Sequence, residues 1–174
     1  MFRQAACAWG AVYYASFLRT QFGLSLSATA LFSLIGAIVI AMALVVGGYF
    51  VNRIGRKRQL VSTLVTSSLL LILVAFLNDL SIILILSWVG GFIFGLGFPA
   101  NTSLILEQTP DSRGIMMSMS TIFVTFGMGL GTALGGFVLI LSCWSGLILT
   151  FAALQLIAAS IYFLLTKDPC RTQC

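Results

Sequence analysis

The chain has 174 residues, of which 60% are hydrophobic and 7% are charged, with no histidine and a formal net charge of +5. This composition excludes a soluble globular domain, because there is too little polar surface to cover an apolar core. The positive charge does not indicate nucleic-acid binding, since four of the nine basic residues lie in one short segment between apolar runs. The sequence therefore predicts a polytopic membrane protein that contacts the lipid bilayer and no nucleic acid.

Long apolar windows predict six membrane-spanning helices and an all-α fold. Helices are expected because backbone polar groups in lipid must be satisfied within their own segment. The predicted helices cover about residues 4–18, 28–51, 59–77, 82–106, 115–140 and 146–166. Together they form a single six-helix transmembrane bundle over residues 1–174.

The first predicted helix is short. Only 15 residues separate Arg3 from Arg19, whereas a spanning helix needs about 20. A signal peptide is the alternative interpretation, but the small-residue cleavage pattern that should follow it is missing. The sequence therefore favours a truncated first helix.

A basic segment at residues 52–58 separates the second and third predicted helices and predicts the orientation of the chain. Basic residues in short loops stay on the cytoplasmic side of the membrane. Alternating the loops places Arg19 alone on one side, and on the other Arg3, Arg53, Arg56, Lys57, Arg58, Arg113, Lys167 and Arg171. We therefore expect a multi-pass protein of the cell membrane with both termini in the cytoplasm.

Glycine is concentrated in the fourth and fifth predicted helices. Small residues allow helix backbones to approach closely in lipid, so these two helices are expected to pack tightly. The third and sixth helices contain almost no glycine and are expected to face lipid, which suggests two units of three helices. The predicted packing residues are Gly91, Gly95, Gly127, Gly131, Gly135 and Gly136.

The basic segment also carries a family resemblance that covers nearly the whole chain. Its spacing is similar to the signature loop of the major facilitator superfamily of secondary transporters. The matching residues are Gly48, Asn52, Arg53, Gly55, Arg56 and Lys57. Asn52 stands where members usually have an acidic residue, and it can cap a helix but cannot form a charged pair.

Two further segments resemble this superfamily. Glu107, Pro110, Arg113 and Gly114 resemble a pattern at the cytoplasmic end of the equivalent helix. The resemblance implies a gating role for the signature loop together with Glu107 and Arg113. The glycines of the fifth helix resemble an antiporter motif, although Thr132 occupies its proline position and will not kink the helix as proline would.

The resemblance implies one half of a transporter, built from two three-helix inverted repeats. The short first helix, the absence of charge between Leu80 and Leu106 and the altered signature loop resemble the carboxy-terminal half of a multidrug-efflux-type permease. The expected partner is a second six-helix half, either the missing amino-terminal half or another copy of this chain.

The implied mechanism is alternating access around a site near the bilayer midplane. Aromatic rings with scattered hydroxyl and amide groups suit a small amphipathic or hydrophobic solute, which would stack rather than form an ion pair. The expected lining residues are Trp9, Tyr13, Phe94, Phe98, Asn101 and Thr125. No titratable residue is expected in the middle of a span, so a proton carrier would lie in the other half.

No enzyme is predicted, because the chain lacks histidine and has no pair of carboxylates within a span. No cofactor or metal is expected either, since Cys170 and Cys174 alone are too few for a zinc site. The alternative function is a non-transporting membrane fragment or scaffold that binds another membrane protein through its glycine-rich helices.

Overall fold

The computed structural model describes residues 2–108 and 113–165, and every regular element in these ranges is a helix. The all-α prediction is therefore confirmed. In chain order the elements are α1 (Phe2–Ala8), the π-helical η1 (Trp9–Tyr13), α2 (Tyr14–Phe22), α3 (Leu26–Ile54), α4 (Arg56–Phe76), α5 (Leu80–Gln108), α6 (Arg113–Leu141) and α7 (Trp144–Leu165). Among the described residues, five helices, α3 to α7, are long and apolar enough to cross a membrane.

The first three elements form one continuous rod from Phe2 to Phe22. A π-helical turn in its middle, where the Tyr14 N–H bonds to the Trp9 carbonyl, accommodates one extra residue. The rod ends at Gly23, which adopts a left-handed conformation with φ 63°. It extends four residues past the predicted end at residue 18 because the polar residues there are exposed and compatible with a helix end.

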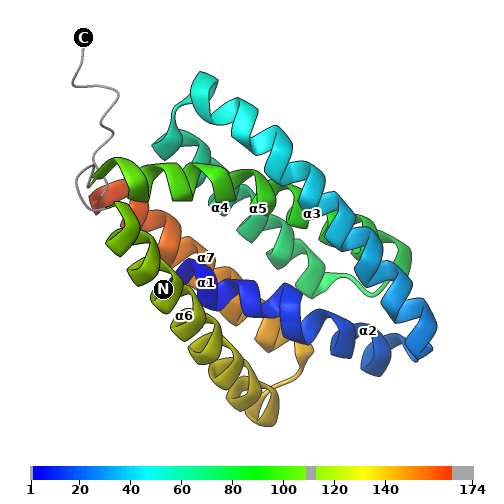
Figure 1. The fold of residues 1–174 in the computed structure, drawn as a ribbon. Helices are drawn as coiled ribbons and strands as arrows, with labels where there is room; N and C mark the ends of the chain where they lie inside the picture. The colour runs from blue at the N-terminus through cyan, green and yellow to red at the C-terminus, as the bar shows by residue number, and fades with distance from the viewer. Residues whose placement is uncertain (1, 109–112, 166–174) are drawn as a thin grey trace.

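The helices pack as two groups of three that share a central contact (Figure 1). In one group α1 lies against α6 and α7, and in the other α5 lies against α3 and α4. The two groups meet where α4 packs along α7. The rod at the start of the chain therefore packs with the last two helices, α6 and α7, and the three helices between them in sequence form the other group.

The third and sixth helices are the more buried ones within the described chain, although the sequence suggested outer helices; their contact with lipid stays a prediction. These helices, α4 and α7, have 44% and 39% of their apolar windows buried, against 11% for α3 and 17% for α6. Serine and alanine replace glycine at the contact: the Ser67 hydroxyl donates to Gln155 Oε1 and the Ser68 hydroxyl to the Ala152 carbonyl, both at 3.1 Å. Counting glycines alone missed this interface, because any small residue lets helices approach.

The glycine-rich fourth and fifth helices do pack closely, but each against a different helix. Their equivalents, α5 and α6, use their glycines against different neighbours. A Cβ atom on Gly95 of α5 would lie 2.8 Å from the Ala43 Cβ of α3, and one on Gly131 of α6 would lie 2.7 Å from the Ala5 Cα of α1. The glycines thus bring each helix close to a partner on its own side of the bundle.

Candidate functional site

A cavity of about 360 Å³ lies between the first rod and helices α3, α4, α5 and α7. Glycines on its wall leave the space open, among them Gly10, Gly36, Gly90 and Gly91. The volume is at the lower end of the range typical of small-molecule sites. Only one of the two glycine-rich helices, α5, contributes to this wall.

Large aromatic side chains form much of the cavity wall. Trp9 comes from the rod, and Trp88, Phe94 and Phe98 come from α5. Trp9 is held in place by the Phe17 ring, whose centroid lies 5.5 Å away, and by the Phe151 ring at 6.5 Å. The aromatic wall can therefore stack against a planar solute without a large rearrangement of the Trp9 ring.

Three polar groups on the cavity wall have no hydrogen-bond partner among the described residues. They are the Tyr14 hydroxyl, the Ser87 hydroxyl and the Trp88 indole N–H. Tyr14 and Ser87 lie near each other, but no hydrogen bond of good geometry joins them. Buried polar groups are normally paired, so these three groups are an unusual feature of this end of the cavity.

Half of the predicted lining residues lie on this cavity and half do not. Trp9, Phe94 and Phe98 line it. Tyr13 instead packs against Gly135 and donates its hydroxyl hydrogen to the Thr132 carbonyl. Asn101 is buried between α5 and α7, where its Oδ1 accepts a hydrogen bond of 2.7 Å from the Tyr162 hydroxyl.

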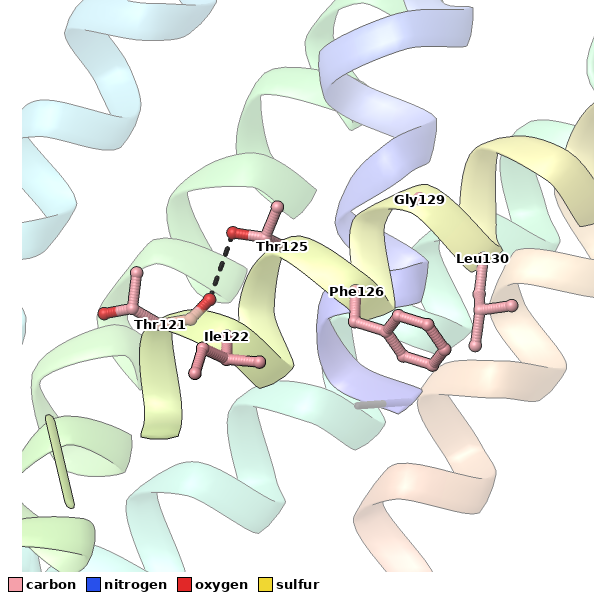
Figure 2. Close-up of a pocket in the computed structure, with 6 residues that line it drawn as sticks. All are labelled: Thr121, Ile122, Thr125, Phe126, Gly129 and Leu130. Carbon is pink, nitrogen blue, oxygen red and sulfur yellow. Dashed lines mark hydrogen bonds between the residues drawn. The ribbon is translucent and has the colours of Figure 1, made fainter. Parts of the chain in front are cut away.

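Thr125 lies on an exposed face of α6, away from the cavity. Figure 2 shows it in a shallow apolar groove, with its hydroxyl donating to the Thr121 carbonyl of the preceding turn at 3.0 Å. The groove is lined from this one helix by Thr121, Ile122, Thr125, Phe126, Gly129 and Leu130. Contact between Thr125 and a solute stays a prediction.

Arg3 occupies a position that the sequence analysis assigned wrongly. It was expected on the cytoplasmic side, but the structure leaves it only 2% exposed. Its guanidinium carbon lies 4.7 Å from the centroid of the Phe94 ring and 4.4 Å from that of Phe98. These two residues are about 15 to 21 Å along α5 from its end at Gln108.

Arg3 is thus a titratable residue beside the middle turns of α5, which the sequence did not predict. Arg3 was assigned to the cytoplasmic side by alternating the basic loops, whereas the structure places it within α1. Only the packing of α1 against its neighbours places the arginine beside the middle turns of α5. The orientation predicted from the basic residues at 53–58 does not depend on the position of Arg3.

The signature segment is a helix junction rather than a seven-residue turn. Helix α3 ends at Ile54, helix α4 begins at Arg56, and Gly55 alone joins them with φ 90°. This φ favours glycine, because a Cβ atom would clash with the backbone. The sequence did not predict so short a junction. Two helices can be joined by one residue only if their axes meet at a suitable angle, and that angle depends on how the helices pack.

The basic side chains at this junction lie along aromatic rings. The Arg53 guanidinium is 5.0 Å from the Tyr49 ring centroid, and the Lys57 ammonium is 5.5 Å from that of Phe163. Gly48 faces open space, with no atom within 4 Å of where a Cβ would lie. The side chains of Asn52, Glu107 and Arg113 lie outside the described residues, so the predicted gating role stays a prediction.

The remaining predicted packing glycines have varied surroundings. Gly91 lies at ordinary contact distance from Ile40, and Gly135 and Gly136 face Tyr13. Gly127 is buried within α6. The close approaches of Gly95 and Gly131 are described above.

Gln59 is a structural residue that sequence reasoning missed. It is 3% exposed, and its amide nitrogen donates to the Gly47 carbonyl at 3.1 Å and to the Leu96 carbonyl at 2.7 Å. One side chain of α4 therefore ties α3 to α5. A glutamine near the start of an apolar helix could have indicated this role, because a buried amide must find hydrogen-bond partners.

No metal centre is formed by the described residues. Across residues 2–108 and 113–165, no three His, Cys, Asp or Glu side chains come together. The cavity instead offers aromatic rings, unpaired hydroxyl and indole groups, and one guanidinium behind the Phe94 and Phe98 rings. This arrangement suits non-covalent binding of a small polar aromatic molecule.

Comparison with known proteins supports the resemblance seen in the sequence. The family model described as "Major Facilitator Superfamily" matches residues 4–173. A curated relative named "Gallate transporter", from Pseudomonas putida, is 30% identical over 132 residues. That match covers 76% of this chain but 28% of the relative, so the chain spans well under half of the relative's length. No solved structure matches the chain.

Proposed function

Because the chain belongs to the major facilitator superfamily of membrane transporters, and is not an enzyme, we propose that it carries a small aromatic solute by alternating access. The observation that carries this proposal is the aromatic cavity between the first rod and α5. It offers flat apolar surfaces together with a few unpaired polar groups, as an amphipathic solute requires.

We further propose that the first rod is a sixth membrane span. Its 21 residues from Phe2 to Phe22 give a length of about 31 Å, and they begin at the depth of the middle turns of α5, so the rod would be the part of this span nearest the outer side. With α3 to α7 this makes six spans, arranged as two three-helix inverted repeats. The basic junction around Gly55 would face the cytoplasm of the cell, together with the carboxy terminus.

The chain would act as one half of a larger transporter. The gallate transporter is much longer than this chain, and α3 and α6 expose most of their apolar side chains. A second six-helix bundle could cover these faces, whether it is an amino-terminal half or a second copy. In the alternative function, the same faces would bind a membrane protein without transport.

The relative's name suggests the class of solute. Gallate is the anion of an aromatic carboxylic acid that carries several ring hydroxyls. An aromatic ring suits the wall formed by Trp9, Trp88 and Phe94, and hydroxyls suit the unpaired groups of Tyr14 and Ser87. The proposed solute is thus amphipathic, as the sequence predicted. We propose efflux as the direction of transport, as the resemblance implies.

Transport measurements with radiolabelled gallate test the function. The chain is expressed in cells lacking their own aromatic-acid carriers and drug pumps, with and without the amino-terminal half of a related permease. Uptake and export are both followed, and a fluorescent hydrophobic cation is the comparison solute. Membrane insertion is checked by immunoblotting of the membrane fraction.

The outcomes separate the arrangements. Gallate movement that requires the partner half supports a split transporter, and movement with the chain alone supports a homodimer. Preference for the hydrophobic cation over gallate would overturn the aromatic-acid assignment while leaving transport intact. Absence of movement of either solute, with the chain inserted, would support the non-transporting scaffold.

A further inference from the structure

Arg3 is a buried cation without a hydrogen-bond partner. Its Nε, Nη1 and Nη2 atoms are all buried, and none makes a hydrogen bond with the described residues. The faces of Phe94 and Phe98 are its observed contacts. Such cation–π contacts stabilise a guanidinium but leave all of its N–H groups unsatisfied.

No acidic side chain of the described residues lies beside Arg3. Asp79 stands in the connection before α5, about 22 Å along the helix from Phe94, and it is exposed. Glu107 is nine residues beyond Phe98, about 13 Å along the same helix, and its side chain is outside the described residues. An ionisable residue within a membrane bundle marks a functional site by default, and this one has an open need for an anion.

The guanidinium lies against aromatic side chains that belong to the cavity wall. Phe94 and Phe98 both contact Arg3 and both line the cavity. Cys7, one turn after Arg3 on α1, lines the cavity as well. The arginine and the cavity therefore share these two rings as a common wall.

We propose that Arg3 binds the carboxylate of the transported solute, with Phe94 and Phe98 forming a movable aromatic wall between the two. The proposal rests on the solute site proposed above and names its anion-binding residue. The planar guanidinium can pair with a carboxylate through two parallel hydrogen bonds. The solute ring would then lie along the aromatic wall.

Equilibrium dialysis of the chain in lipid nanodiscs tests this assignment. Radiolabelled gallate is compared with methyl gallate, which keeps the ring and hydroxyls but has no carboxylate charge. The wild-type chain should bind gallate at least tenfold more tightly than the ester. Arg3→Met should remove this preference while changing the affinity for methyl gallate less than threefold.

Two further variants separate the ion pair from a structural effect. Arg3→Lys keeps the charge but loses the planar fork, so it should retain part of the preference. Arg19→Met removes an exposed arginine at the opposite end of the same rod and should leave both affinities unchanged. If Arg3→Met fails to insert stably, two measurements still test whether Arg3 binds the carboxylate: the comparison of gallate with its ester on the wild-type chain, and the same comparison on Arg3→Lys.

Each remaining result counts against the proposal in a distinguishable way. Equal binding of gallate and methyl gallate by the wild-type chain would overturn the carboxylate anchor but leave the solute site standing. Undiminished preference for gallate in Arg3→Met would do the same. Binding of neither compound to the wild-type chain would overturn the anchor together with the aromatic-acid site on which it rests.

Discussion

Single residues hold the helices of this chain together through backbone contacts as much as through side chains. The amide of Gln59 joins two carbonyls on different helices, and Gly131 lets the backbone of α6 reach that of α1. In lipid there is no hydrophobic force between helices, so such close contacts and hydrogen bonds determine which helices pair.

Gly131→Ala tests this at one position. The added Cβ would lie 2.7 Å from the Ala5 Cα, and a backbone atom cannot rotate away as a side chain can. We expect the free energy of unfolding to fall by about 1–3 kcal/mol. Titration of the chain in mixed micelles with a denaturing detergent measures the change.

Gly129→Ala is the matched control on the same helix. Nothing lies within 4 Å of the Cβ position of Gly129, which is exposed. We expect it to be neutral or slightly stabilising, because alanine favours helices over glycine. Equal losses in both variants would mean that the α1–α6 approach does not depend on Gly131.

At the scale of elements, the junction between α3 and α4 depends on the backbone of Gly55. Its φ of 90° and ψ of 139° lie in a region that side chains strongly disfavour. Gly55→Ala should therefore lower the free energy of unfolding by about 1–3 kcal/mol, as measured by the same titration.

Gly48→Ala provides the comparison for the junction. Gly48 is also part of the signature, but it lies within α3 and has no neighbour within 4 Å of its Cβ position. Its replacement should change stability by less than about 0.5 kcal/mol. A loss at Gly48 as large as that at Gly55 would show that the signature stabilises the chain by other means than the junction's conformation.

At the scale of the whole molecule, the proposed orientation has a direct chemical test. Cys143 is exposed between α6 and α7, on the side expected to face outward. In a chain whose other cysteines, Cys7, Cys170 and Cys174, are replaced by serine, a membrane-impermeant maleimide should label Cys143 in intact cells.

A cysteine at the basic junction tests the cytoplasmic side of the membrane. Arg58→Cys, made in a chain without other cysteines, should be labelled only after the membrane is permeabilised, since Arg58 is exposed at the start of α4. Labelling of Arg58→Cys in intact cells, with Cys143 protected, would reverse the proposed orientation.

The candidate site could be predicted only in part. Trp9, Phe94 and Phe98 were expected near the bilayer midplane from the implied alternating-access mechanism, and they line the cavity. Depth along a helix does not give the direction in which a side chain points, so the same reasoning also proposed Tyr13 and Thr125, which lie elsewhere. Trp88 and Ser87 were missed because they are closer to a helix end.

The sequence by itself determined the class, the helical fold and the family, because these follow from apolar length, glycine content and the spacing around Gly55. Only the tertiary structure decided which helices pair. It buried α4 and α7 through serine and alanine contacts, and it placed Arg3 against Phe94 and Phe98. These features depend on the rotation of each helix about its axis, and all six apolar segments carry too little amphipathic pattern to specify that rotation.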